Sequence, residues 1–201
     1  YDVTVQGQYA YVADGDSGLR VIDVSDPENP QEVAFSHTSD RALNVAVYGR
    51  YAYVADRSAG LQIIEVINPT QEGTLSPFYY PQDVAVSETY AYVADHMDGL
   101  KVINISDPTS PTQVGSTLTR ERALGVTLTE MYAYVADGDS GLTIVDITNP
   151  LSPNVVGGEN TPGWAVNVTV DGNWAYVSDE AAGLRIFDVS DRSNPSEVGF
   201  Y

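Results

Sequence analysis

The chain has 201 residues, and its 9 lysines and arginines against 28 aspartates and glutamates give a formal net charge of −19 at pH 7. A field of this sign repels phosphate backbones and anionic lipid headgroups, which argues against nucleic acid and membrane surfaces as partners. The sequence has no cysteine and no apolar run long enough to span a bilayer, which excludes disulfides, thiolate metal sites and membrane insertion.

The first elements along the chain are four short segments that are typical of β-strands and are joined by turns. They cover residues 2–5 (DVTV), 9–14 (YAYVAD), 19–24 (LRVIDV) and 31–35 (QEVAF). Tyr, Val and Ile favour strands, clusters of Gly, Asp, Asn and Pro favour turns, and the apolar residues show no helical period. The sequence therefore predicts an all-β fold.

The same four segments return four more times. The first tyrosine of the second segment recurs in steps of 42, 39, 42 and 42 residues, at Tyr9, Tyr51, Tyr90, Tyr132 and, as tryptophan, Trp174. Four strands in about 42 residues is the period of a β-propeller blade, whose apolar faces are covered by neighbouring blades. We therefore predict a five-bladed β-propeller with four antiparallel strands per blade. It forms one domain over residues 1–201, with blades at about 1–38, 39–77, 78–119, 120–161 and 162–201.

The third segment and the turn after it carry a resemblance to a known family. The five copies read LRVIDVSDPENP, LQIIEVINP, LKVINISDPTSP, LTIVDITNP and LRIFDVSDRSNP. In these positions the chain resembles the LVIVD-repeat family over essentially its whole length, with departures at Glu65, Asn104 and Arg192. The resemblance implies a propeller of the kind common on bacterial and archaeal secreted or surface proteins, so we expect an extracellular or cell-surface location. It supplies no catalytic or ligand-binding residues to carry over.

The ends of the sequence leave the closure of the ring open. The sequence begins with the first strand of one copy and ends with the fourth strand of the last, so no exchange of a terminal strand locks the ring. Either five blades close by packing alone, or the chain is part of a longer one with further blades. We expect closure with five blades.

Two turns of each copy read as parts of the scaffold. An aspartate ends every second segment, at Asp14, Asp56, Asp95, Asp137 and Asp179. Each precedes a turn that ends in glycine, where we expect the carboxylate to accept backbone N–H groups. The SDP, INP and TNP motifs after the third segment are typical of Asx turns opened by proline.

Functional residues are expected where the copies differ, above all in the linkers between blades, which are residues 36–43, 76–82, 116–124 and 158–166. In a propeller these linkers and the turns after the second strands lie on one face around the channel mouth, which we call the linker face.

Counting three residues back from each first strand gives four large side chains: Arg41, Tyr80, Arg122 and Trp164. Such residues are enriched at binding hot spots, so we predict a ligand-binding surface there, with Phe78 and Tyr79 beside it. The alternative is that they plug the channel. The variable turn residues could extend the surface: Arg57, His96, Met97, Asp139 and Glu180.

The starts of the first strands form a second set of equivalent positions, a predicted channel ring of Asp2, Asn44, Asp83 and Asn167, with Gly125 in the fourth copy. These side chains could hold a cation, water or a sugar hydroxyl in the central channel, although we favour the interpretation that they satisfy backbone donors. We predict no other cofactor and no metal site, because His37 and His96 have no paired motif beside them.

The leading functional prediction is a non-enzymatic binding or scaffolding module that recognises protein or glycan through the linker face. One alternative is a glycoside hydrolase-like enzyme whose catalytic carboxylates would be Asp2 and Asp83 at the channel, with Asp40, Glu121 and Glu159 as further candidates in the linkers. Another alternative is a structural subunit that assembles with copies of itself into a surface layer or filament.

Overall fold

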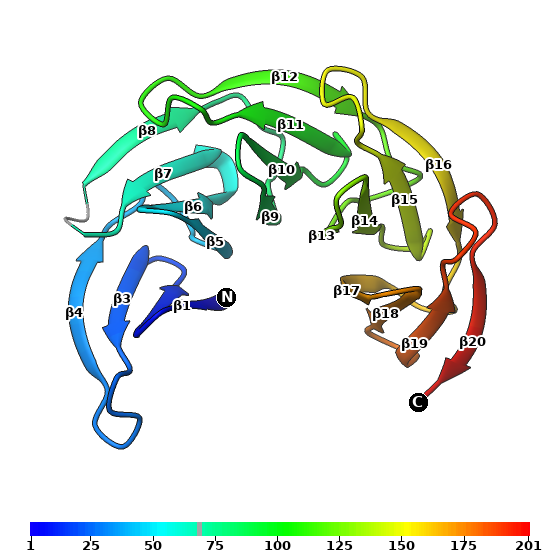
Figure 1. The fold of residues 1–201 in the computed structure, drawn as a ribbon, viewed down its shortest axis with the longest axis horizontal. Helices are drawn as coiled ribbons and strands as arrows, with labels where there is room; N and C mark the ends of the chain where they lie inside the picture. The colour runs from blue at the N-terminus through cyan, green and yellow to red at the C-terminus, as the bar shows by residue number, and fades with distance from the viewer. Residues whose placement is uncertain (68–69) are drawn as a thin grey trace. The chain divides into compact units, whose positions relative to one another are not determined.

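A computed structural model describes residues 1–67 and 70–201, and in these residues the chain is built from five four-stranded antiparallel sheets (Figure 1). In every sheet the strands are hydrogen-bonded in sequence order. The predicted all-β fold with four strands per repeat is therefore confirmed. The described part of the chain contains no helix that is long and apolar enough to cross a membrane.

The sheets follow one another along the chain. The first sheet contains β1 (Asp2–Gln6), β2 (Tyr9–Ala13), β3 (Leu19–Asp23) and β4 (Gln31–Ser36). The second contains β5 (Asn44–Tyr48), β6 (Tyr51–Ala55), the 3-10 turn η1 (Arg57–Ala59), β7 (Leu61–Glu65) and β8 (Gln71–Leu75). The third contains β9 (Asp83–Val86), β10 (Tyr90–Ala94), β11 (Leu100–Asn104) and β12 (Thr112–Thr117). The fourth contains β13 (Gly125–Leu128), β14 (Tyr132–Ala136), β15 (Leu142–Asp146) and β16 (Asn154–Glu159). The fifth contains β17 (Ala165–Asp171), β18 (Trp174–Asp179), β19 (Gly183–Asp188) and β20 (Ser196–Phe200).

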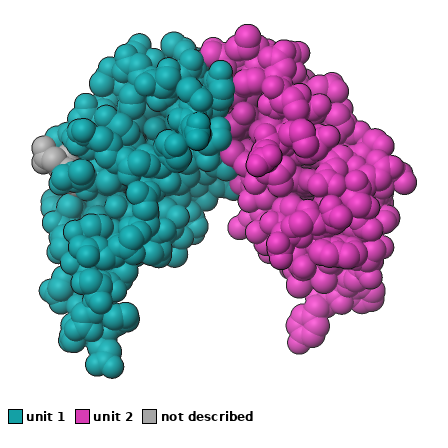
Figure 2. Space-filling view, in the orientation of Figure 1, with its two compact units in different colours: residues 1–91, 103–112 teal, residues 92–102, 113–201 magenta. Residues whose placement is uncertain are grey.

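By its internal contacts the chain divides into two compact units (Figure 2). Unit 1 contains residues 1–91 and 103–112, and unit 2 contains residues 92–102 and 113–201. Each sheet lies within one of the five predicted blade segments. Strand pairing among the described residues runs within single sheets, and closure of the propeller by pairing was not detected.

The two faces of each sheet carry different side chains because successive strand residues point to opposite faces. In the first sheet Tyr11 pairs with Val21, and Val12 beside it pairs with Arg20. We call the face with Tyr11 the tyrosine face and the face with Val12 the valine face, and we use the same names for the equivalent faces of the other sheets.

Within each unit, neighbouring sheets bury these faces against each other. In unit 1 one apolar cluster joins the tyrosine face of the first sheet to the valine face of the second: Tyr11, Leu19, Val21, Val45, Val54 and Ile64. In unit 2 a matching cluster joins the fourth and fifth sheets: Tyr134, Leu142, Ile144, Val168, Val177 and Phe187. Full burial of such a side chain stabilises the fold by about 1.5–3 kcal/mol, so neighbouring sheets supply the cover that the propeller prediction requires.

The valine face of the first sheet is exposed. Val3 and Val5 of β1 are 58% and 62% exposed, whereas Val45, at the position of Val3 in the second sheet, is 3% exposed. The difference follows from the packing order, because in unit 1 a valine face is buried by the tyrosine face of the sheet that precedes it in the chain.

Strand bounds in the first sheet agree with the sequence prediction to within one residue, but β17 starts early. It begins at Ala165, two residues before the predicted start at Asn167. Ala165 exchanges two backbone hydrogen bonds with Gly138, at 3.0 and 3.2 Å, and also pairs with Asp179 in β18. The bridge to the preceding turn recurs at Ala42 and Ala123, which lie outside β5 and β13, so what distinguishes β17 is the pairing of Ala165 with Asp179, the last residue of β18.

Candidate functional site

Three turns after the second strands are tied to the linker that enters the next sheet. Backbone hydrogen bonds run both ways in three pairs: Gly15 with Ala42, His96 with Ala123, and Gly138 with Ala165. The alanines directly follow Arg41, Arg122 and Trp164, which are three of the predicted binding residues. The backbone therefore holds each of these three residues beside a turn.

A buried aspartate anchors the linker that carries Glu121 and Arg122. The carboxylate of Asp137 accepts hydrogen bonds from Thr119 Oγ1 and the backbone N–H of Arg120, both at 2.7 Å, and from the N–H of Glu121 at 3.0 Å. Burial raises the pKa of Asp137, and the hydrogen bonds offset only part of that rise. Thr143 Oγ1 of β15 donates to the same carboxylate at 2.8 Å. The carboxylate thus accepts backbone N–H groups as expected, and these groups belong to the linker.

Two other aspartates of the series bind linkers in the same way. Asp56 accepts a hydrogen bond from Thr38 Oγ1 at 2.8 Å, and Asp179 accepts one from the N–H of Gly163 at 2.9 Å. Asp179 also accepts the N–H of Ala182 in its own turn at 2.9 Å, as the sequence predicts. Asp56, Asp137 and Asp179 therefore each bind a linker, and Asp179 also binds its own turn.

Basic side chains meet the remaining two aspartates. Arg20 pairs with Asp14 in the first sheet. Lys101 Nζ lies 2.6 Å from Asp95 Oδ2 and 3.0 Å from Asp98 Oδ2 in the third sheet.

In unit 1, Arg41 and Tyr80 lie among aromatic and charged side chains. Arg41 Nη2 donates to Tyr1 Oη at 2.6 Å, and Arg41 Nε lies 3.4 Å from Asp16 Oδ1. Arg57, in the turn η1, places its Cζ 4.9 Å from the centre of the Tyr80 ring. Such cation–π contacts are worth about 0.5–1 kcal/mol at exposed sites. Each of the first two predicted residues thus contacts an aromatic or charged side chain within unit 1.

The two aromatic residues predicted beside Tyr80 have different environments. Phe78 is half-buried and covers the turn at Gly60, where an added Cβ would lie 3.0 Å from Phe78 Cδ2. Tyr79 is 58% exposed. Of the pair, Tyr79 is therefore the side chain that a partner could reach.

In unit 2, three half-buried side chains meet around Gly138. The Cζ of Arg122 lies 5.0 Å from the centre of the Trp164 ring, and Arg122 Nε lies 3.4 Å from Glu121 Oε1. A Cβ placed on Gly138 would lie 2.8 Å from Glu121 Oε2 and 3.0 Å from Trp164 Nε1, so the absence of a side chain there leaves room for the group. We call Glu121, Arg122 and Trp164 the unit 2 cluster.

Three polar atoms of the unit 2 cluster are buried and have no hydrogen-bond partner among the residues described: Glu121 Oε2, Arg122 Nε and Trp164 Nε1. Buried polar atoms are usually paired, and an unpaired one costs about 1–3 kcal/mol. One acceptor and two donors at the same place match a group that both donates and accepts, such as a hydroxyl or an amide.

His96 borders this cluster through its backbone bonds to Ala123. Burial and, secondly, the charge of Arg122 lower the pKa of His96 below its usual value. The imidazole is therefore neutral at pH 7 and adds no positive charge beside Arg122.

The predicted channel ring bonds to backbone. Asp2 Oδ2 accepts the N–H of Val45, and Asn44 Oδ1 accepts the N–H of Val84, both at 3.3 Å. The other two accept the N–H of the residue that follows them, Asp83 at 2.8 Å and Asn167 at 2.7 Å. Asp2 and Asp83, the two channel carboxylates of the enzyme alternative, thus accept hydrogen bonds from backbone N–H groups. In residues 1–67 and 70–201 no three His, Asp or Glu side chains are grouped as metal ligands.

Counting positions within the repeat did not find every residue of these groups. Tyr1 directly precedes the first strand, and the equivalent positions hold Leu43, Gln82, Leu124 and Val166, so no repeated residue type indicates a role for it. The sequence predicts a role for Glu121 only as a carboxylate of the enzyme alternative, and it predicts none for Gly138. A glycine at a turn position that holds Arg57 and His96 in other copies was the available signal for Gly138.

The LVIVD repeat model matches five segments that cover most of the chain, residues 1–38, 40–73, 80–119, 122–161 and 162–201. No curated protein matches the chain at a significant level.

Solved structures with the same fold have low sequence identity to this chain. A functionally unknown protein from Desulfotomaculum acetoxidans superposes with a TM-score of 0.84 at 17% identity, over 98% of this chain and 68% of that chain. U3-55K gives a TM-score of 0.79 at 13% identity, over 99% of this chain and 65% of its own. The β-propeller domain of Cps50 (Swd1) from Myceliophteria thermophila superposes with a TM-score of 0.76 at 13% identity, over 95% of this chain and 66% of that chain. The likeness shows a propeller fold, and the chain spans about two thirds of the length of these structures.

Proposed function

This chain belongs to the LVIVD-repeat family, and from that premise we propose that it is a non-enzymatic binding module of a secreted or cell-surface protein. It recognises a protein or a glycan through the linker face. The observation that carries the proposal is the set of three buried polar atoms in the unit 2 cluster that make no hydrogen bond.

The chemistry of the cluster suits a hydroxyl or a peptide group as the first point of contact. Trp164 Nε1 and Arg122 Nε are donors, and Glu121 Oε2 is an acceptor, so a ligand hydroxyl or amide can pair with both kinds. The hydrogen bonds from this linker to Asp137 hold Glu121 in place before the ligand arrives, which lowers the entropy lost on binding.

The unpaired atoms also bear on the alternative that these side chains plug a channel. A plug is permanently buried, and buried polar groups in a stable structure are nearly all paired. Two donors and an acceptor that make no internal hydrogen bond, with Arg122 Nε held only in an ion pair to Glu121, favour a surface completed by a ligand.

A single-tryptophan protein offers a direct test of ligand binding. The chain has two tryptophans, so Trp174→Phe leaves Trp164 as the sole tryptophan, whose emission can be excited selectively at the red edge of the absorption band. We expect a ligand selected from an oligosaccharide panel or a peptide library to shift the emission of this variant. In the same background, Trp164→Phe removes the Nε1 donor and keeps an aromatic ring, and we expect at least about tenfold weaker binding by calorimetry, since a lost hydrogen bond of this kind costs about 1.4 kcal/mol.

The matched control is the Trp174→Phe protein itself, which should bind as tightly as the unmodified chain. If the Trp164→Phe and Glu121→Gln variants bound the selected ligand as tightly as the Trp174→Phe control does, the proposal would be contradicted. A large fall in melting temperature for Trp164→Ala and Tyr80→Ala, with no ligand found, would instead support the plug. Turnover of an oligosaccharide that is lost in Asp83→Asn would favour the enzyme alternative.

A further inference from the structure

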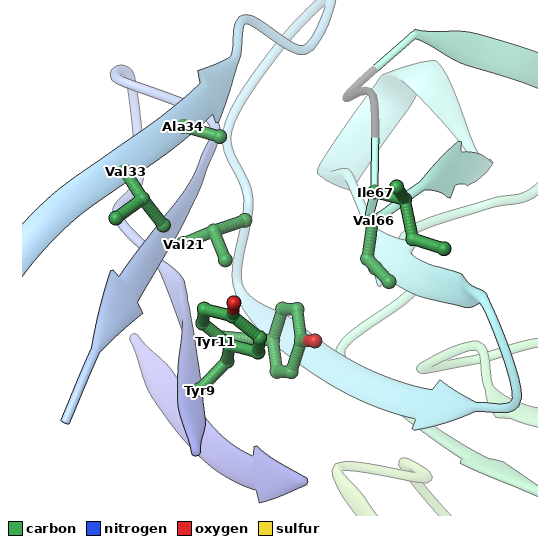
Figure 3. Close-up of a pocket in the computed structure, with 7 residues that line it drawn as sticks. All are labelled: Tyr9, Tyr11, Val21, Val33, Ala34, Val66 and Ile67. Carbon is green, nitrogen blue, oxygen red and sulfur yellow. The ribbon is translucent and has the colours of Figure 1, made fainter. Parts of the chain in front are cut away.

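A second site lies in unit 1, at the end of the sheets where β2 begins and β7 ends, opposite to the linkers. A pocket of about 240 Å³ is lined by Tyr9, Tyr11, Val21, Val33, Ala34, Val66 and Ile67. The first five residues come from the first sheet, and Val66 and Ile67 face them from the segment after β7 (Figure 3). This volume lies below the roughly 300–1,000 Å³ of usual small-molecule sites and suits a side chain with a short stretch of backbone.

The pocket lies where one loop of the repeat is short. Seven residues (66–72) separate Glu65 from Gly73 in the second copy. Ten residues separate the equivalent positions in the other copies, which are 24–33, 105–114, 147–156 and 189–198. Three of the ten-residue loops contain two prolines and the fourth contains one, as does the short loop. The second copy therefore lacks three residues and, relative to most copies, one proline.

The next interface in unit 1 shows what a ten-residue loop does in this place. The loop after β11 lies on Gly73 of β8, and a Cβ on Gly73 would overlap the carbonyl oxygen of Pro108 and lie 3.2 Å from Pro111 Cδ. The second proline of the loop thus packs on the outer strand of the preceding sheet.

The third and fourth sheets repeat this contact within unit 2. A Cβ on Gly115 would overlap the carbonyl oxygen of Pro150 and lie 3.1 Å from Pro153 Cδ. In the first sheet the equivalent position holds Ala34 instead of glycine. The methyl group of Ala34 lines the pocket opposite Val66.

Where the first proline is absent, another side chain contacts the same surface. In unit 2 Arg192 stands at that loop position, donates from Nε to Tyr134 Oη at 3.1 Å, and places Cζ 5.7 Å from the centre of the Tyr132 ring. Tyr132 and Tyr134 are the counterparts of Tyr9 and Tyr11.

We propose that the pocket binds an extended, proline-containing peptide segment of a partner protein, which takes the place that the second proline of a ten-residue loop takes at the other interfaces. Grooves lined by aromatic side chains recognise proline in the polyproline II conformation, because the ring packs on the aromatic surface and the segment loses little entropy on binding. This site is separate from the linker face.

Two further features favour such a ligand. Burial, with a smaller contribution from Tyr9, raises the pKa of Tyr11, so its hydroxyl stays protonated and can donate to a peptide carbonyl. The net charge of −19 attracts a segment that carries basic residues.

The probe is a capped nonapeptide with the sequence of residues 105–113 in which lysine replaces Asp107, so that its charge opposes that of the protein. Titration into ¹⁵N-labelled protein should shift amide signals of β2, β3 and β4 near the pocket. A control peptide with alanine in place of both prolines should bind at least about tenfold more weakly, equivalent to about 1.4 kcal/mol. No shifts at millimolar peptide, or equal binding of the alanine peptide, would overturn the proposal.

A loop-restored protein tests the site from the other side. Residues Thr-Ser-Pro inserted after Pro69, together with Ala34→Gly, recreate the ten-residue loop and the glycine beneath it. We expect this protein to lose peptide binding at least tenfold, to melt at a higher temperature because the pocket is filled, and to keep its linker-face ligand. Peptide binding as tight as that of the unmodified protein would show that the pocket is not the site. Saturation of the pocket by indole with no response to the peptide would mean that the occupant is a small molecule, and the proposal would be wrong.

Discussion

At the scale of single residues, the buried carboxylate of Asp137 links the scaffold to the candidate site. Asp137→Ala leaves the N–H groups of Arg120 and Glu121 without an acceptor in a buried place. Unpaired buried donors cost about 1–3 kcal/mol each, while removal of a carboxylate whose pKa is raised by burial offsets part of that cost. We expect urea denaturation to give a free energy of unfolding lower by about 3 kcal/mol.

Asp139 is the matched control for Asp137, because it is exposed in the same turn. Asp139→Ala should change the free energy of unfolding by less than about 0.5 kcal/mol. Similar losses in the two variants would mean that the local charge, and not the hydrogen bonding of the linker, is what stabilises this region.

At the scale of the elements, the loop after each third strand and the outer strand of the preceding sheet must fit each other. Gly73→Ala would place a methyl group on the carbonyl oxygen of Pro108. Overpacking of this kind costs about 1–3 kcal/mol, so we expect a lower urea midpoint at an unchanged m-value. Gly199 is the equivalent glycine of β20, and a Cβ there would lie 3.9 Å from Ile186 Cδ1, in ordinary contact. Gly199→Ala should therefore be neutral or slightly stabilising, and a loss equal to that of Gly73→Ala would rule out the loop contact as the cause.

The strands could be predicted from the sequence because each one occurs five times. Tyr9 and its counterparts mark the start of the second strand in each sheet. Where one copy is ambiguous, the other copies indicate where its strand begins. The early start of β17 could not be predicted, because it depends on the pairing of Ala165 with Asp179 across a shift in register, which the repeat does not show. The short loop after β7 is visible as a step of 39 residues, but its consequence depends on Ala34, which lies on a different sheet.

The sequence predicts where the residues of the candidate site lie along the chain, but not which of their side chains contact each other. Arg122 and Trp164 could be found by counting back from the strands, because the bridges between turns and linkers repeat. Their grouping with Glu121 over Gly138 involves two linkers and a turn that share no sequence pattern. Tyr1 follows no pattern of this kind, because the residue that binds Arg41 is a tyrosine in the first copy alone.

At the scale of the whole molecule, the net charge of −19 adds self-repulsion that opposes the folded state. Raising sodium chloride from 0.01 M to 1 M shortens the Debye length from about 30 Å to about 3 Å and screens this repulsion. We expect the free energy of unfolding to rise by about 1 kcal/mol, which raises the melting temperature by about 2–4 °C in a chain of this size. Scanning calorimetry across the salt series measures it.

A triple variant separates net charge from local ion pairs. Glu28→Gln, Glu130→Gln and Asp139→Asn change three exposed acidic residues and bring the formal charge from −19 to −16. Because repulsion is weaker in this variant, it should melt at a higher temperature at low salt and depend less steeply on salt than the unmodified chain. Local pairs such as Arg185 with Glu197, at 2.6 Å, are weakened by salt and act in the opposite direction. A melting temperature that falls as salt is added would mean that such pairs, and not the overall charge, dominate the electrostatics of the fold.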